Sequence, residues 1–350
     1  MNLKPFRLLF WIVAVFSIQS GFAQEEKRER LFDSEEPLAM KMSFSIKDLK
    51  ANTNDSVFMT QEIEVMGVGG DWETLPFEMR TRGNFRLDRC FYPPMRIRMS
   101  KDDAKGTLFQ GNRKLKLVLP CAKTKGSDSY VGKEFIAYKM YDEVSEYTFQ
   151  TRLVKVTFVN TDDKKAEPTE LLGFLIEDDE DAAERFEGEV MDGKKIAPQI
   201  MADTATVIHD FFQMMIGNTD WSGLYQHNQK VMKLDAQTVV PFAYDFDMTG
   251  LVNPPYAQVN SNISITKVTE RLYRGFCRDQ SVFDYARGIF LEKESDIMGV
   301  IDTYSAYYTE ADAKAMRSFV SEFFTILKSD KMYQDKIVQS CRKPDGTYGF

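Results

Sequence analysis

The sequence predicts an α+β fold, with strands in the first half of the chain and helices in the second. Alternating apolar and polar residues indicate short strands up to residue 177, and apolar residues at helical spacing prevail from about residue 280 to 342. An acidic stretch, 178–189, separates the two patterns. We therefore expect a sheet-rich N-terminal lobe and a helical C-terminal lobe, with a boundary near Asp178.

The first 23 residues have the pattern of a secretory signal peptide. Lys4 and Arg7 precede an apolar run that is too short to span a bilayer comfortably, and small residues stand before Gln24. An uncleaved anchor helix is the alternative. We expect an exported protein, located in the periplasm, at the cell surface or outside the cell, with no membrane span after signal cleavage.

The mature chain divides into three predicted parts. Residues 24–42 are expected to form a mobile leader because their charged start is poor in apolar residues, 43–178 the N-terminal lobe, and 179–350 the C-terminal lobe. In the N-terminal lobe, strands are predicted at 56–66, 75–81, 94–99, 114–119, 152–159 and 171–177, and one helix at 132–144. In the C-terminal lobe, helices are predicted at 203–216, 281–291, 297–307, 310–327 and 333–341, and a hairpin at 231–234 and 238–244.

Charge and cysteine content narrow the class of protein. The net charge is −8, and the chain has no block of lysines and arginines, which argues against a nucleic-acid partner. Export permits disulfides, and the positions of the four cysteines favour the pairs 90–121 and 277–341, although two other connectivities stay open. A zinc site is the less favoured alternative, since there is no CxxC pair and the chain has only two histidines.

Two acidic clusters follow strongly apolar stretches. The first is Asn218-Thr-Asp220 with His227-Asn228 close behind, and the second is Tyr244-Asp245-Phe246-Asp247. Carboxylates at the ends of buried elements are costly to desolvate unless they are paired. A metal ion or the proton of a substrate hydroxyl would satisfy them.

Phosphoryl transfer requires side chains of these types in a compatible order. One carboxylate orients the acceptor hydroxyl, another carboxylate and an amide hold Mg²⁺, and a lysine positioned by a helix glutamate contacts the phosphates. The chain offers Lys116 on a strand and Glu134 in the next helix. Asp220 and Asn228 then lie in a loop, and Asp245 ends a later strand.

From about Met79 to Ala257 the chain resembles the atypical protein kinases typified by the spore coat kinase CotH, including exported members from Bacteroidetes-type bacteria. The resemblance is carried by Arg82-Gly83-Asn84, Gly173-Phe-Leu-Ile-Glu177, the Asn218–Asn228 loop and the Tyr-Asp-Phe-Asp of 244–247. It implies a two-lobed, atypical protein-kinase-like fold. It also implies transfer of the ATP γ-phosphate, with Mg²⁺ or Mn²⁺, to Ser, Thr or another hydroxyl on an unidentified protein or small molecule.

The resemblance also assigns roles to individual residues. Asp220 is the expected catalytic residue. The metal ligands are expected to be Asn228, Asp245 and Asp247. The expected nucleotide-binding residues are Lys116, Glu134 and Arg82.

Each of these residues also has a structural interpretation. The aspartates are also suited to capping turns or pairing with arginines, Lys116 to a solvated sheet face, and Arg82 to an ion pair. His227 is interpreted as structural, and His209 as a satisfied core histidine. The alternative function is a catalytically inactive, kinase-like envelope protein that acts as a binding or assembly module. A metal-dependent hydrolase is less favoured, because no histidine cluster or nucleophile motif accompanies the acids.

Overall fold

The structure is a computed structural model of the 350-residue chain, and it describes residues 30–83, 85–191, 193, 195–259 and 263–343. The predicted signal peptide, 1–23, lies outside the described residues.

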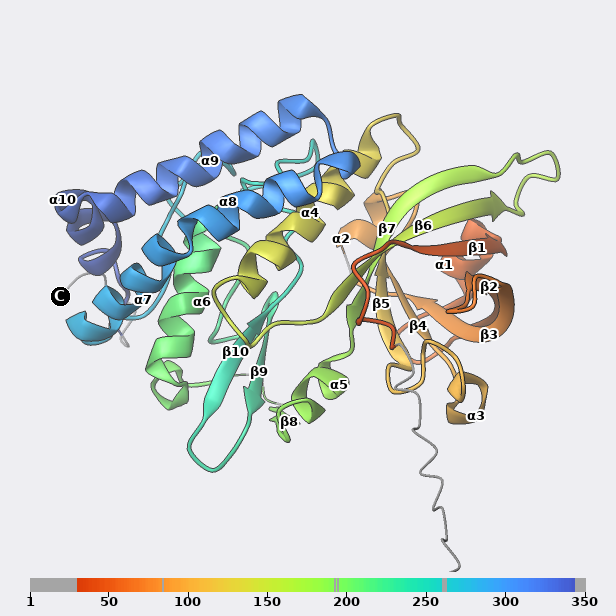
Figure 1. Cartoon of the computed structure of the whole chain (residues 1–350), viewed down its shortest axis with the longest axis horizontal. Coiled ribbons are helices and arrows are strands. Elements are labelled where there is room, and N and C mark those ends of the chain that lie inside the picture. Colours follow the sequence, from red (N-terminus) through yellow and green to blue (C-terminus); the bar gives the residue numbers. More distant parts are fainter. Residues whose placement is uncertain (1–29, 84, 192, 194, 260–262, 344–350) are drawn as a thin grey trace, which may run out of the picture.

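Seven strands close into a barrel in the order β1-β2-β3-β4-β5-β7-β6 (Figure 1). Strand β1 pairs in parallel with β6, and the other neighbouring strands pair antiparallel. The strands are β1 (Leu38–Phe44), β2 (Met59–Met66), β3 (Trp72–Thr81), β4 (Met95–Arg98), β5 (Lys114–Val118), β6 (Thr151–Asn160) and β7 (Thr169–Glu177). Alternate side chains of these strands fill the interior with one apolar core.

The predicted two-lobed, kinase-like fold is wrong, because its N-terminal sheet is a closed, mixed barrel. Strand β1 closes the barrel, although residues 24–42 were predicted to form a mobile leader. Leu38, Met40 and Met42 are buried in the barrel core, so this part of the segment is sheet. The pairing of Leu38 with Val154 joins segments far apart in the chain, and such pairing leaves no local sequence signal.

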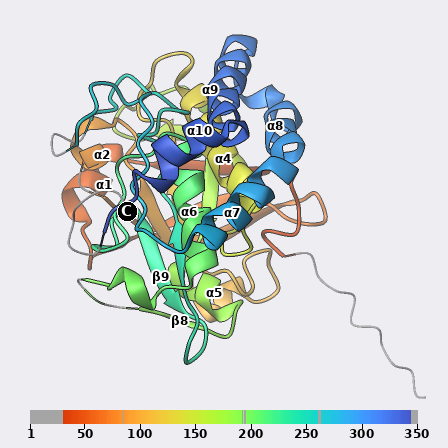
Figure 2. The same ribbon diagram turned by 90° about the vertical axis from the view of Figure 1, so that its left-hand side faces the viewer.

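The part of the chain after Glu177 has a sheet of its own as well as helices. Its order is β10-β9-β8, formed by β8 (Glu189–Val190), β9 (Gln229–Lys233) and β10 (Val239–Ala243). Helix α6 (Asp203–Met215) lies between this sheet and helix α9, as both views show (Figures 1 and 2). Because α6 is covered on both sides, ten of its thirteen residues are buried. The helical C-terminal lobe predicted with the kinase-like fold is therefore also wrong, although the hairpin predicted at 231–234 and 238–244 corresponds to β9 and β10.

Most of the helices lie outside the barrel, and α5 leads from the last barrel strand to the second sheet. Helix α4 (Ser127–Asp142) follows β5, packs against β7 and α8, and buries most of its residues. The other long helices are α7 (Gln280–Glu292), α8 (Glu294–Thr303) and α9 (Glu310–Lys328). The shorter ones are α1 (Ile46–Asn52), α2 (Phe85–Arg89), α3 (Lys101–Ala104), α5 (Asp179–Glu184), α10 (Asp330–Tyr333), the 3₁₀ turns η1 (Pro198–Ile200) and η2 (Ser305–Tyr307), and the π-helical turn η3 (Gln334–Val338).

Both favoured disulfides are present: Cys90 is bonded to Cys121, and Cys277 to Cys341. The first joins the segment after α2 to the segment between β5 and α4. The second joins the chain before α7 to the end of η3. The predicted strands and long helices correspond to elements of the structure within a few residues, whereas β1, α1, α2 and α3 were not predicted. The domain boundary near Asp178 stays a prediction.

Candidate functional site

The β9–β10 hairpin brings Asn228 and Asp245 to the same end of one ladder. Gln229 pairs with Ala243, and the backbone N–H of Tyr244 donates to the carbonyl of Asn228 at 3.2 Å. Asn228 therefore directly precedes β9, and Asp245 follows β10 by one residue. The backbone N–H of Asp245 donates to the Tyr138 hydroxyl of α4 at 2.9 Å, which holds this corner against the helix.

Asp220 reaches the same corner from the end of helix α6. The chain leaves the helix through Gly217, whose φ of 64° is readily adopted only by glycine. The Asn218 side chain then accepts a 2.9 Å hydrogen bond from the backbone N–H of Asp220, forming a turn. Arg274 donates to the carbonyl of Thr219 and so anchors the turn from outside.

Asp220, Asn228 and His227 form one hydrogen-bonded group. Asn228 Nδ2 donates to the Asp220 carbonyl at 2.6 Å and to Asp220 Oδ2 at 3.2 Å, and His227 Nε2 lies 3.1 Å from Asp220 Oδ1. The hydrogen bond with His227 lowers the pKa of Asp220, burial opposes this, and the charge of Arg274 lowers it further. The Asp220 carboxylate is therefore ionised at neutral pH, as a group that accepts a proton or a cation must be.

A second group of acids lies beside these residues, around the buried guanidinium of Arg86 in α2. Arg86 Nη1 is 3.6 Å from Glu134 Oε2 of α4 and 3.5 Å from Asp247 Oδ2. We call Arg86, Glu134 and Asp247 the Arg86 cluster. Burial raises the pKa of Glu134 to about 8, Arg86 opposes this, and the charges of Asp247 and Asp245 raise it further. Burial likewise raises the pKa of Asp247 to about 6 against the effect of Arg86, and Asp245 again adds to the increase.

The Arg86 cluster is incompletely paired. Within the described part of the chain, Glu134 Oε1, Asp247 Oδ2 and Arg86 Nη1 are buried and have no hydrogen-bond partner, because the ion pairs are too long for hydrogen bonds. Buried polar atoms are nearly always paired, so orphans gathered at one place indicate a missing water, ion or ligand. Asp247 Oδ2 lies 3.5 Å from Arg86 Nη1, and the charges of Asp245 and Asp220 reach the Asp247 carboxyl. As a carboxylate oxygen it is a donor of the kind that Mg²⁺ requires.

The first disulfide holds Arg86 in place. The N–H of Cys90 donates to the Arg86 carbonyl at 2.9 Å, and the N–H of Phe91 donates to the Cys121 carbonyl at 2.7 Å. Arg86 Nη2 in turn donates to the carbonyl of Leu119 at 3.4 Å. The short helix α2 is thereby clamped to the segment that leads into α4, which carries Glu134.

Lys116 belongs to a different group of charges. It pairs with Asp179 at the start of α5 and donates to the Glu177 carbonyl at 3.3 Å. Lys230 also reaches Asp179, at 3.0 Å, and Arg96 lies 3.2 Å from Asp178. We call these residues the Lys116 cluster. The expectation that Glu134 positions Lys116 is therefore not met, because each has a different partner.

Arg82 lies just beyond β3, where its N–H donates to the carbonyl of Pro94 at 2.9 Å. Its Nε is buried and has no hydrogen-bond partner among the described residues. Its charge lowers the pKa of Glu134, against the effect of burial, so Arg82 lies near the Arg86 cluster. The structure therefore brings six of the seven predicted site residues into one region. Lys116 is paired with Asp179 instead, although its Nζ lies 5.5 Å from the centre of the Tyr244 ring, next to Asp245.

Three residues of this region were missed in the sequence analysis or given no functional role. Arg86 lies on the short helix α2, which was not predicted. Tyr256 was given no role, yet its hydroxyl lies close enough to Asp247 to lower the pKa of that carboxyl. Arg274 belongs to no recognised motif. His209 is confirmed as a core residue: it is fully buried, with its ring nitrogens 2.9 Å from Asp210 and 3.1 Å from Gln213.

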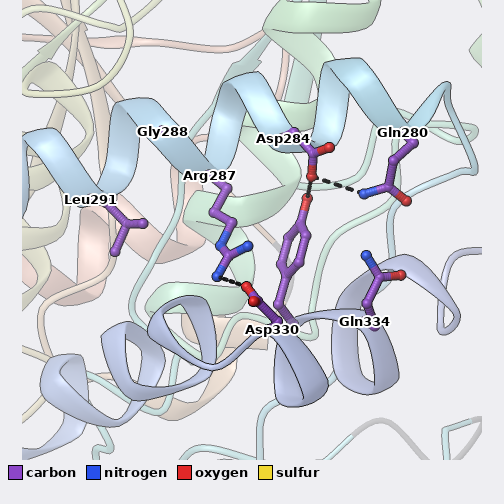
Figure 3. Close-up of a pocket in the computed structure, with 8 residues that line it drawn as sticks. Gln280, Asp284, Arg287, Gly288, Leu291, Asp330 and Gln334 are labelled. Atoms are coloured by element: carbon purple, nitrogen blue, oxygen red, sulfur yellow. Dashed lines mark hydrogen bonds and ion pairs between the residues drawn. The ribbon is translucent and has the colours of Figure 1, made fainter.

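A hollow lined by C-terminal helical residues is separate from this region (Figure 3). It lies between α7 and the segment α10–η3, with Arg287 and Asp330 facing each other across it at 2.7 Å. Asp284 accepts from Gln280 at 2.8 Å and from the Tyr333 hydroxyl at 3.0 Å. Because these polar groups form hydrogen bonds and an ion pair with one another, they give no indication of a bound ligand.

Comparison with known proteins does not assign the chain to a family. No protein-family model matches the chain, and no curated protein matches its sequence. Within residues 30–343, apart from the few positions not described, no group of three His, Cys, Asp or Glu side chains is arranged to hold a metal ion. Any metal ion would therefore depend on the amide of Asn228 and on substrate oxygens as well. In the same described residues, every helix is too short or too polar to cross a bilayer.

Proposed function

We propose that this chain is an exported, CotH-like, Mg²⁺-dependent phosphotransferase that uses ATP and a hydroxyl acceptor. The observation that supports it most is the convergence of Asp220, Asn228 and Asp245 from two separate loops at one end of the β9–β10 hairpin. The proposal rests on this set of side chains and on the motifs that resemble CotH-like kinases, and not on the fold. The two disulfides fit an oxidising compartment such as the periplasm or the cell exterior.

The side chains divide the work as follows. Asp220, ionised and held by two donors, orients the acceptor hydroxyl and accepts its proton. The metal ion would be held by Asn228, Asp245 and Asp247 Oδ2, and it would neutralise charge on the phosphates. Arg82, with an unpaired buried Nε, is suited to contact a phosphate oxygen. Lys116 approaches the nucleotide only if its contact with Asp179 opens.

Variants of the two key aspartates test this proposal. Asp220→Ala should abolish transfer of labelled phosphate from ATP to periplasmic acceptors and leave nucleotide binding intact, because Asp220 touches the acceptor. Asp245→Ala should abolish metal-dependent nucleotide binding in calorimetry. Glu170→Gln, an exposed position on β7, is the matched control. Wild-type protein that shows neither Mg²⁺-dependent nor Mn²⁺-dependent ATP binding would refute the proposal.

A non-catalytic binding or assembly protein of the cell envelope is the second candidate. The observation that favours it is the pairing of Lys116 with Asp179. The lysine expected to contact the phosphates is thereby already neutralised by a carboxylate. Under this hypothesis the Arg86 cluster is a structural ion network, and calorimetry with ATP and Mg²⁺ shows no binding.

A further inference from the structure

The loop around His227 is held in a costly backbone conformation. Gln226 and Asn228, on either side of His227, have φ angles of 52° and 51°, a region that non-glycine residues rarely adopt. Two backbone hydrogen bonds between Ser222 and His227, of 3.0 and 3.1 Å, close the loop. For Gln226 this conformation costs roughly 1 kcal/mol or more, whereas asparagine adopts it more readily, and conformations of this kind cluster at functional sites.

This strained loop directs the His227 ring at Asp220. Nε2 lies 3.1 Å from Asp220 Oδ1, while Asn228 Nδ2 reaches the other carboxylate oxygen at 3.2 Å. The backbone N–H of Asp220 is also held, by Asn218. With one donor on each oxygen, the plane of the carboxylate is set, and one lone pair of each oxygen is left for another group.

Stability does not explain this arrangement. The His227 side chain is 59% exposed and that of Asp220 is 35% exposed, and pairs of such exposure contribute about 0–1 kcal/mol. That gain does not exceed the cost of the left-handed conformation of Gln226. His209 provides the contrast, because it is fully buried with both ring nitrogens satisfied inside α6.

We propose that His227 is a positioning residue, whose Nε2–H fixes the Asp220 carboxylate in the orientation that receives the acceptor hydroxyl. This inference rests on the proposed function. The charged groups that face the pair are Asp245 at the end of β10 and Arg274, and neither occupies the contact between Nε2 and Oδ1. His227 acts through Asp220 and does not touch the reacting atoms.

Three substitutions of His227 separate positioning from general stabilisation. His227→Gln places an amide N–H near the position of Nε2, His227→Asn places it near Nδ1, and His227→Ala removes the donor. We expect kcat to fall about tenfold to a hundredfold in the alanine and asparagine variants, as misplaced catalytic groups do, with an unchanged KM for Mg²⁺–ATP. His227→Gln should restore most of kcat.

The matched control is Tyr225→Ala, an exposed residue of the same loop, which should leave kcat and KM unchanged. An active wild type whose His227→Ala variant keeps its kcat would overturn this inference alone. A wild type that transfers no phosphate overturns the proposed function, and this inference with it.

The ring tautomer is a second measurement that does not depend on activity. The chain has only two histidines, so His227→Gln assigns the ¹⁵N signals of both rings. We expect the neutral His227 ring to carry its proton on Nε2 and to lose this preference in Asp220→Ala. A proton found on Nδ1 in the wild type would overturn the inference whatever the activity.

Discussion

The Lys116 cluster and the Arg86 cluster are both buried groups of acids and bases, but they are paired to different degrees. In the Lys116 cluster, Asp179 is in contact with Lys116 and 3.0 Å from Lys230. Burial alone would raise the pKa of Asp179, but these two cations lower it to about 2. In the Arg86 cluster, the ion pairs are 3.5 and 3.6 Å long, and the pKa values of both acids are raised.

This difference indicates which cluster is structural. Asp179, whose ionised form is matched by two cations, stabilises the fold, although Asp178 Oδ2 of the same cluster has no hydrogen-bond partner and burial lowers the pKa of Lys116. Acids with raised pKa values, such as Glu134 and Asp247, are typical of functional sites. The sequence pattern pointed to Lys116 as the functional cation. Its close pairing with Asp179 indicates that Lys116 links the barrel to α5. We infer that Arg82 and Arg86 are the cations of the proposed site.

The two disulfides give the largest expected effect. Removing Cys90–Cys121 or Cys277–Cys341 by paired serine substitutions frees loops of 31 and 64 residues. Each change should lower the free energy of unfolding by about 4 kcal/mol, measured by urea denaturation. Only loss of the first should release α2 and alter the pH dependence that Glu134 produces, because only that bond holds Arg86. If both disulfide variants changed the pH dependence of stability equally, the first disulfide would have no special role in holding Arg86.

Lys116→Met and Arg86→Met compare the clusters directly. Lys116→Met leaves Asp179 ionised with weaker partners, so it should lower the free energy of unfolding by about 3 kcal/mol at pH 5. Arg86→Met should cost less at pH 5, because Glu134 and Asp247 have raised pKa values and can bind protons. Urea denaturation of both variants at pH 5 measures this, and a larger loss for Arg86→Met would reverse our assignment.

The pH dependence of stability should have opposite signs in the two clusters. Glu134 has a pKa of about 8 in the folded protein against 4.5 ordinarily, so the folded state binds the extra proton between these values. Stability should fall as the pH rises from about 4.5 to 8, by on the order of 2 kcal/mol, and Glu134→Gln should remove the part of this fall above pH 6, because Asp247, with a pKa of about 6, contributes only below that pH.

Asp179 has a lowered pKa, so it contributes stability above its ordinary value of 3.8 that is lost as the pH falls toward about 2. Asp179→Asn should remove this loss at acid pH and leave the neutral range unaltered. Thermal unfolding of the wild type, Glu134→Gln and Asp179→Asn from pH 2 to 9 measures both pH dependences of stability. The same pH dependence in all three proteins would show that Glu134 and Asp179 do not cause it.

The smallest effect is expected at Lys230, whose side chain is 30% exposed. Lys230→Ala should lower the free energy of unfolding by less than about 1 kcal/mol, because solvent screens the pair and Lys116 still contacts Asp179. Urea denaturation at low and high salt measures this. A loss as large as that of Lys116→Met would show that the cluster depends on the exposed cation.

The sequence was informative where the pattern is local. Alternation in Met95–Arg98 and Lys114–Val118 predicted β4 and β5, and the apolar run of α6 predicted a buried helix. The motif residues Asp220, Asn228 and Asp245 do lie together, because hairpin pairing and a turn after α6 join their segments. Partners of buried charges were not predictable, since the partner of Glu134 lies on α2, a helix too short to show periodicity.

The amino-acid sequence by itself determined β2–β7, the β9–β10 hairpin, the long helices and the order of the site residues, because the spacing of apolar side chains specifies local backbone geometry. Only the tertiary structure decided that the sheet closes through β1 and β6, and that Glu134 faces Arg86 while Lys116 faces Asp179. Both outcomes depend on contacts between distant segments, whose free energy is set by burial and by the partners that packing leaves within reach.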